Sequence, residues 1–178
     1  MSLHADAVEV LESWSAPDRD QEELRRTYLA HLAAYPHAML RECRPDHLTA
    51  SVIILSEDRR HVLLTLHRKL QRWLQTGGHC ESTDDRLAAA AAREGAEESG
   101  LDDLRIDPEP VLLSRHEVPC GPVRPAHHLD VKFVAYASAG ARPTVSDESD
   151  DVRWFRAAEL PASTDASVRT LVHHARRR

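Results

Sequence analysis

Residues 77–101 read GGHCESTDDRLAAAAAREGAEESGL, a run that predicts a tight turn followed by a helix. Two glycines, Gly77 and Gly78, end the preceding segment. The alanine-rich part, residues 84–99, predicts the helix. Gly100 suits the position just past the helix end, where the backbone often turns left-handed. The run therefore predicts where one helix begins and ends, directly behind a glycine turn.

Three glutamates of this helix should form one patch. Glu94, Glu97 and Glu98 are three and four residues apart, a spacing that places side chains on one side of a helix. Like charges at this spacing repel each other by about a few tenths of a kcal/mol per pair. A divalent cation removes that repulsion, and hard oxygen ligands suit Mg²⁺ or Mn²⁺. The same spacing is also typical of a solvated acidic face, so the surroundings must discriminate between the two.

The surroundings of the glutamates resemble the signature box of the Nudix hydrolase family. That box runs Gly, five residues, Glu, seven residues, then Arg-Glu-U-x-Glu-Glu-x-Gly-U, where U is a bulky aliphatic residue. The resemblance spans 24 residues, and the matching positions are Gly78, Arg93, Glu94, Glu97, Glu98, Gly100 and Leu101.

The chain departs from the box in three places. Asp84 stands where the first box glutamate belongs, and eight residues rather than seven separate it from Arg93. Gly95 replaces the aliphatic residue that follows Arg-Glu. A glycine here should cost the helix about 1 kcal/mol in propensity, a cost that close packing of the helix on a sheet would explain.

The resemblance implies a metal-dependent hydrolase. Its reaction would cleave the diphosphate bond of a nucleoside diphosphate linked to another moiety, with Mg²⁺ or Mn²⁺ as cofactor and a small nucleotide-type molecule as substrate. Glu94, Glu97 and Glu98 are implied as metal ligands, and the carbonyl of Gly78 would complete the set. Arg93 is implied to orient the carboxylates.

The resemblance also implies a residue that handles the attacking water. In many relatives a loop glutamate positions this water, just before a strand that follows the box. The acidic loop 146–151 lies in that place, and Glu148 is our choice within it. Glu94 is the alternative acceptor of the water proton, and a merely solvated loop is the competing interpretation.

Two further groups of residues are weaker candidates. The first group, Arg68, Lys69 and Arg72, is basic and lies between a predicted hairpin and the glycine turn. These side chains would contact substrate phosphates or simply face solvent. The second group, Glu81, His79 and His128, would lie behind the metal ligands or bind a further metal, although single histidines are more often structural.

The pattern along the rest of the chain predicts an α/β fold, and the resemblance makes it a Nudix-type α/β/α sandwich with a central mixed sheet. Residues 1–47 are expected to form an N-terminal helical extension, with helical periodicity over residues 4–44, and residues 48–178 the Nudix domain. The extension has apolar stripes but no acidic cluster, so it should pack on a flank of the sheet or on a second copy in a homodimer. Strands are predicted at 51–55, 61–67, 111–118, 128–137 and 151–155, and a last helix at 163–177.

Composition excludes several classes of protein. The chain has 178 residues and a net charge of −6, which gives no general attraction for a nucleic acid duplex or an anionic membrane. No apolar run approaches the roughly 20 residues of a membrane span, and the N-terminus lacks a secretory signal pattern. Three widely spaced cysteines predict neither a disulfide framework nor a zinc pair. A cytoplasmic location with reduced thiols is the expectation.

Two other functions compete with hydrolysis. A non-catalytic nucleotide sensor on the same fold would usually lose box acids, and here the acids are present. An isopentenyl diphosphate isomerase-like enzyme would need a cysteine just before the Gly78-His79 pair, where Gly77 stands. Both alternatives remain open, and turnover with Mg²⁺ discriminates between an enzyme and a sensor.

Overall fold

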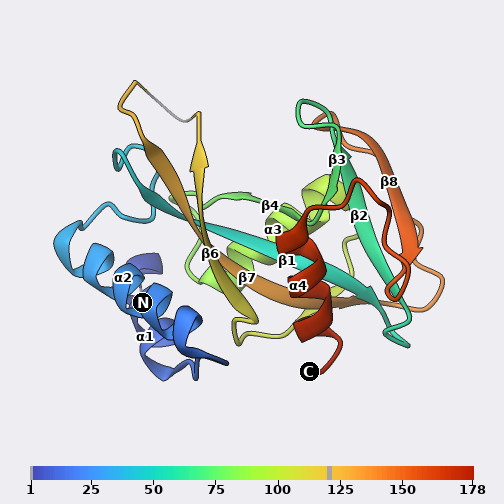
Figure 1. The fold of residues 1–178 in the computed structure, drawn as a ribbon, viewed down its shortest axis with the longest axis horizontal. Helices are drawn as coiled ribbons and strands as arrows, with labels where there is room; N and C mark the ends of the chain where they lie inside the picture. The colour runs from blue at the N-terminus through green and yellow to red at the C-terminus, as the bar shows by residue number, and fades with distance from the viewer. Residues whose placement is uncertain (1, 120–121) are drawn as a thin grey trace.

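The computed structural model describes residues 2–119 and 122–178, which form four helices and an eight-stranded sheet (Figure 1). The helices are α1 (Leu3–Ser13), α2 (Arg19–Ala34), α3 (Leu87–Ser99) and α4 (Ala166–Ala175). The strands are β1 (His47–Ser56), β2 (His61–His67), β3 (Arg72–Leu74), β4 (Thr76–His79), β5 (Leu104–Ile106), β6 (Leu112–Val118), β7 (Ala126–Ala137) and β8 (Ser149–Arg156).

Strands β1 and β7 form the centre of the sheet. They run parallel, from His47 opposite His128 to Ser56 opposite Ala137. The other pairings in the sheet are antiparallel: β1 also pairs with β2 and β4, β7 with β5 and β6, and β2 with β3 and β8. The sheet is therefore mixed, and its two central strands bring distant parts of the sequence together.

Helices cover both faces of this sheet. Successive residues of a strand point to opposite faces, so β1 contributes to two cores. Val52 and Ile54 pack in the core that includes α3, and Ile53 and Leu55 pack in the core that includes α4. Figure 1 shows α4 in front of the sheet and α3 behind it. The predicted α/β/α sandwich with a central mixed sheet is confirmed.

The N-terminal helices belong to the same core as α3. Leu11, Tyr28 and Leu32 are almost completely buried in it. The side chain of Gln21 exchanges two hydrogen bonds with the backbone of Leu113 on β6, of 2.7 and 3.1 Å. We expected these helices to pack either on a flank of the sheet or on a second copy of the chain. The structure shows them packed on the sheet.

Asp6 of α1 caps the start of α3. The amide of Leu87, the first residue of α3, donates to Oδ2 of Asp6 at 2.8 Å. The residue that precedes the helix, Arg86, makes no such contact with its own side chain. A carboxylate at the N-terminal end of a helix accepts a hydrogen bond from a free backbone amide. Its negative charge is also attracted by the positive end of the helix dipole.

Some predicted boundaries were wrong. Helix does not extend to residue 44: as the prolines at 17 and 36 indicate, the helical region is divided, α2 ends at Ala34, and turns follow, because Pro36 disfavours helix in the residue before it. Helix α3 begins at Leu87 rather than near residue 84, since Asp84 instead accepts a 2.8 Å hydrogen bond from the Glu81 amide. The short strands β3, β4 and β5 were not predicted.

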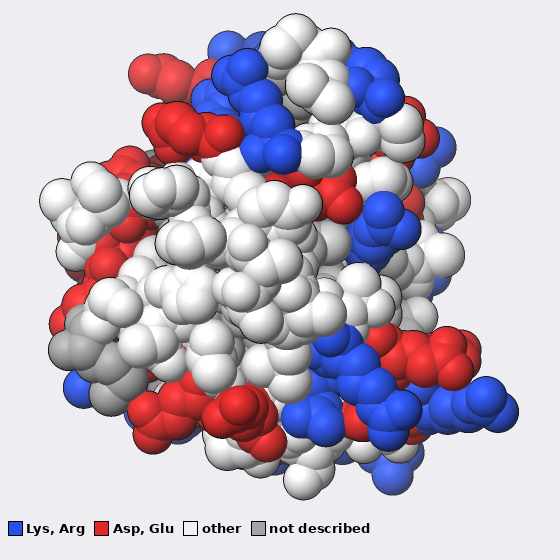
Figure 2. All heavy atoms as spheres, turned by 90° about the vertical axis from the view of Figure 1, so that its left-hand side faces the viewer, with Lys and Arg blue, Asp and Glu red and all other residues white. Residues whose placement is uncertain are grey.

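The surface carries mixed charge. On the side of the molecule that Figure 2 shows, acidic and basic side chains surround a largely uncharged centre, without a continuous basic surface among the described residues. Among residues 2–119 and 122–178, none of the helices combines the length and the apolar character needed to cross a bilayer.

Candidate active site

Gly77 and Gly78 lie within strand β4 rather than in the predicted turn, and the missing side chain of Gly78 lets Glu94 of α3 approach the backbone of β4. Gly77 has a φ of +148°, and a Cβ there would lie 2.2 Å from Cβ of Ser51 on β1. A Cβ on Gly78 would lie 2.5 Å from Oε2 of Glu94. Side chains at these two positions would therefore collide with β1 and with a box carboxylate, which explains the Gly-Gly pair physically.

Glu98 is the most buried of the three helix carboxylates. Its Oε1 accepts a 2.7 Å hydrogen bond from the Gly77 amide. Burial raises its pKa from 4.5 to about 7, and the Gly77 hydrogen bond opposes this while the charges of Glu94 and Glu148 add to it. Glu98 thus sits where its negative charge is poorly compensated in the absence of a cation.

Glu94 and Glu97 complete the acidic patch. The pKa of Glu94 is raised, chiefly by burial; Arg93 lowers it, and the charges of Glu97 and Glu148 raise it. The side chain of Glu97 is 58% exposed at the rim. The charge of Glu148, in the loop before β8, raises the pKa of both Glu94 and Glu98.

Arg93 forms hydrogen bonds to several residues of the site. Its guanidinium donates to both oxygens of Asp84, at 3.2 and 3.1 Å. It also donates to Glu94 at 3.0 Å and to Glu97 at 3.1 Å. A further hydrogen bond of 3.0 Å reaches the His79 carbonyl at the end of β4. The pKa of Arg93 is raised, with the Asp84 hydrogen bonds as the largest cause, so this side chain is a permanent cation between the carboxylates.

These contacts explain the variant box. Asp84, in place of the first box glutamate, lies beside Arg93, with its side chain only 7% exposed. Gly95 lies where α3 packs tightly on the sheet, since a Cβ there would be 2.8 Å from Cγ1 of Val52 and 3.2 Å from Cδ1 of Leu104. The expected reason for a glycine in the helix is therefore confirmed.

The donor set fits a hard divalent cation. Glu94, Glu97 and Glu98 offer carboxylate oxygens on one side of α3, and Gly78 lies against Glu94. The raised pKa values of Glu94 and Glu98, caused chiefly by burial, show that their charged forms are disfavoured in the folded protein, and a bound cation would relieve this. Oxygen ligands of this kind suit Mg²⁺ or Mn²⁺ better than softer metals.

The predicted basic group lies on the surface and is partly engaged. Arg68 forms a 3.0 Å ion pair with Asp150, and Arg72 a 3.3 Å ion pair with Asp165 at the start of α4. Lys69 is exposed in the turn between β2 and β3. Arg68 and Arg72 therefore already have carboxylate neighbours, Asp150 on β8 and Asp165 at the start of α4.

The other predicted group does not stay together. Glu81 is 59% exposed and lies 3.8 Å from Arg93 at the outer edge of the box. His79 and His128 lie on the sheet, with ring centroids 4.9 Å apart. The structure thus places Glu81 with the carboxylates and the two histidines in a cluster of their own.

Sequence reasoning missed a buried polar network beside this cluster. Asp130 on β7 accepts hydrogen bonds from Thr49 at 3.0 Å and Ser51 at 2.7 Å. Lys132 is buried 3.8 Å from Asp130. The alternation of β7 could have revealed it, because the apolar Leu129 and its i+2 neighbours predict that Asp130 and Lys132 share the opposite face.

Comparison with known proteins identifies the family. A family model described as NUDIX domain matches residues 45–174. The chain belongs to the Nudix hydrolase family. The predicted family and enzyme class, a Nudix pyrophosphohydrolase, are thereby confirmed. A separate search of curated proteins gave no match.

Solved Nudix structures share the fold at low sequence identity. A NUDIX family hydrolase from Clostridium perfringens has a TM-score of 0.62 at 22% identity, over 74% of this chain and 96% of the other. A C. elegans Ap4A hydrolase in a binary complex has a TM-score of 0.60 at 17% identity, over 71% and 93%. The NUDIX domain of Shewanella oneidensis NrtR, complexed with ADP ribose, has a TM-score of 0.57 at 19% identity, over 83% and 96%.

Proposed function

We propose that this Nudix protein is a divalent-metal-dependent hydrolase that cleaves the diphosphate bond of a nucleoside diphosphate linked to another moiety. The observation that carries the proposal is the placement of Glu94, Glu97 and Glu98 along one side of α3, with Glu98 hydrogen-bonded to the Gly77 amide and its pKa raised to about 7. An acidic patch cannot bind a diphosphate directly, because both are negatively charged, so a cation must lie between them.

Glu94, Glu97, Glu98 and the carbonyl of Gly78 would hold Mg²⁺ or Mn²⁺. Such an ion supplies charge neutralisation at the phosphates and lowers the pKa of a bound water. Arg93 orients two of the ligands through its hydrogen bonds to Glu94 and Glu97. Their carboxylates are thereby held in one geometry before substrate arrives, which avoids reorganisation during the reaction.

Glu148 is our choice for the residue that accepts the proton of the attacking water, with Glu94 as the alternative. Glu148 comes from a separate loop yet influences the pKa of Glu94 and Glu98 electrostatically. A carboxylate accepts the water proton where it lies within hydrogen-bond reach of the attacking water.

The substrate is proposed to be a small nucleotide derivative. Two structural neighbours with this fold are an Ap4A hydrolase and a domain complexed with ADP ribose. Both of these molecules, Ap4A and ADP ribose, contain a nucleoside linked through phosphates to another group. Arg68, Lys69 and Arg72 are proposed to bind the substrate phosphates, for which Arg68 and Arg72 would exchange their present partners Asp150 and Asp165. A homodimer remains a proposal for the protein in solution.

A substrate panel tests this function. Nucleoside diphosphate sugars, dinucleoside polyphosphates and nucleoside triphosphates are incubated with the protein and Mg²⁺ or Mn²⁺, and the released products are resolved. We expect turnover of at least one class, which chelator abolishes and Glu97→Gln lowers by about 100-fold or more. Glu159→Gln, an exposed glutamate outside the site, is the matched control. Tight nucleotide binding without turnover would instead support the sensor.

A further inference from the structure

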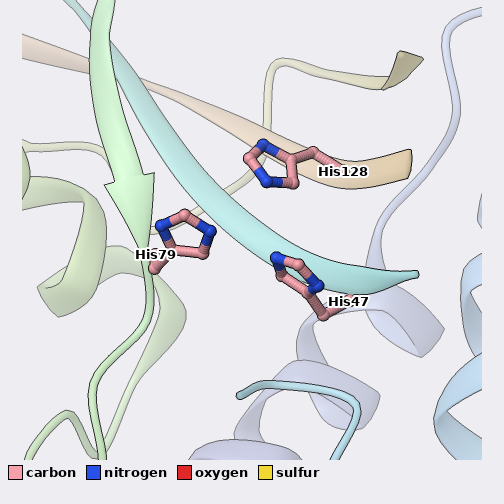
Figure 3. Close-up of side chains that lie close together, drawn as sticks. All are labelled: His47, His79 and His128. Atoms are coloured by element: carbon pink, nitrogen blue, oxygen red, sulfur yellow. The ribbon is translucent and has the colours of Figure 1, made fainter. Parts of the chain in front are cut away.

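Three histidines from three strands converge at one end of the sheet. They are His47 at the start of β1, His79 at the end of β4 and His128 near the start of β7. Their ring centroids are 4.9 to 5.1 Å apart. Figure 3 shows the three rings grouped around a common space. One ring nitrogen of each lies within 4.8 Å of one nitrogen of each of the others.

Strand pairing explains this convergence. His47 and His128 are direct partners in the parallel register of β1 and β7. His79 is the antiparallel partner of Thr49, which is two residues from His47 and on the same face of β1. The three side chains thus leave one face of the sheet from neighbouring positions, and the backbone fixes their relative placement.

The ring nitrogens that face one another have no hydrogen-bond partner within the described residues. Nε2 of His47, His79 and His128 is buried in each case and makes no hydrogen bond there. His47 is oriented by its other nitrogen, since Nδ1 lies 3.2 Å from the Cys43 carbonyl oxygen. A carbonyl only accepts hydrogen bonds, so Nδ1 carries the proton and Nε2 of His47 presents a lone pair.

Burial is the largest cause that lowers the pKa values of His47 and His128, in the latter case to about 3. The neighbouring imidazoles lower the pKa of His128 further. Neutral imidazole is the form that binds metal ions.

We propose that His47, His79 and His128 bind a zinc-class divalent transition-metal ion, in a site separate from the carboxylate site of α3. Three imidazoles without a carboxylate favour Zn²⁺ over Mg²⁺ or Mn²⁺. Zinc–nitrogen bonds of about 2.0–2.1 Å would require the nitrogens to approach to roughly 3.4 Å, which small rotations of the rings provide. The hydrogen bond from His47 to a backbone carbonyl is the usual support of a metal-binding histidine.

The ion would hold three strand ends together. It would tie β4 to β1 and β7 immediately after Gly78, at the residue whose carbonyl accepts the Arg93 hydrogen bond. The site takes its fourth ligand from water or from His116, whose ring centroid lies 5.5 Å from that of His128. The role that follows is stabilisation of the sheet beside the box, without participation of the ion in hydrolysis.

Zinc titration of the full chain tests this proposal. The protein is purified without a histidine tag, treated with chelator, and titrated calorimetrically with Zn²⁺ in excess Mg²⁺, which occupies the carboxylates. We expect one zinc ion per chain. Zn²⁺ at about 100 times its dissociation constant should raise the melting temperature by roughly 5–10 °C. Co²⁺ in place of Zn²⁺ should give the intense visible absorption of a four-coordinate site.

Matched variants locate the ion. His79→Ala and His128→Ala should weaken zinc binding by on the order of 100-fold, whereas His173→Ala, an exposed histidine on α4, should leave it unchanged. Glu97→Gln with Glu98→Gln should also leave it unchanged, so the result is independent of the proposed hydrolase activity. Zinc binding that survives both histidine variants, or is lost with the glutamates, would overturn the proposal. Absence of the Co²⁺ absorption in the unmodified protein would overturn it without any variant.

Discussion

Replacing Glu98 by Gln should remove activity and at the same time stabilise the metal-free protein. Burial raises the pKa of Glu98 from 4.5 to about 7, so its ionised form is disfavoured in the folded state. A folded pKa above the unfolded one means that stability is lost as pH rises from about 5 through 7. At roughly 1.4 kcal/mol per pKa unit, the full penalty at pH 8 is about 3 kcal/mol, and at pH 5 it falls below about 1 kcal/mol.

The glutamine variant keeps the shape and removes the charge. Its amide oxygen can still accept the hydrogen bond from the Gly77 amide. We therefore expect Glu98→Gln to raise the free energy of unfolding in chelator by about 1–3 kcal/mol at pH 8, with a much smaller gain at pH 5. Activity with Mg²⁺ should fall by about 100-fold or more, because a charged ligand is lost.

Urea denaturation followed by tryptophan fluorescence measures the effect at both pH values. Glu97→Gln is the control for stability, since the side chain of Glu97 is 58% exposed and its charge stays in water. Equal stability of Glu98→Gln and the unmodified protein at pH 8 would refute the reasoning, as would a gain of the same size at pH 5. Either result would mean that Glu98 is not held in a buried, uncompensated state.

Three further variants test the supports of α3. Arg93→Lys keeps the charge but loses the branched donor, so kcat/KM should fall by about 10–100-fold in a steady-state assay. Gly95→Ala should lower the free energy of unfolding by about 1–2 kcal/mol in urea, because a Cβ 2.8 Å from Cγ1 of Val52 overpacks the core by more than the roughly 1 kcal/mol gained in helix propensity. Asp6→Ala should lower the melting temperature by about 2–4 °C through loss of the cap on α3, whereas the exposed Glu9→Ala should not.

The sequence was informative where a pattern repeats over many residues. The alternation of 61–67 and 128–137 and the box helix were predicted close to β2, β7 and α3. Strands β3, β4 and β5 have three or four residues each, too few for a period to show. Their existence depends on pairing with longer strands, which is a tertiary effect that local propensity does not encode.

The residues of the acidic patch were predictable because helix spacing alone brings them together. His47 was not, because its place beside His128 follows from the parallel register of β1 and β7. Parallel partners are separated by a long connection, and no local signal sets their register. For the same reason the sequence suggested a metal role for His79 and His128 individually but not the cluster that they form with His47.

The N-terminal extension is separate from the Nudix domain in the sequence but packs into the same core in the structure. The family model begins at residue 45, and we propose residues 1–47 as an N-terminal extension of the Nudix domain. Yet this extension supplies Asp6 to the first amide of α3 and buries Leu11 and Tyr28 in the core that α3 shares. Since α3 carries Glu94, Glu97 and Glu98, the extension supports the helix on which the proposed chemistry depends. It contributes none of the carboxylate ligands proposed on α3, but its cap and its packing set where those carboxylates lie.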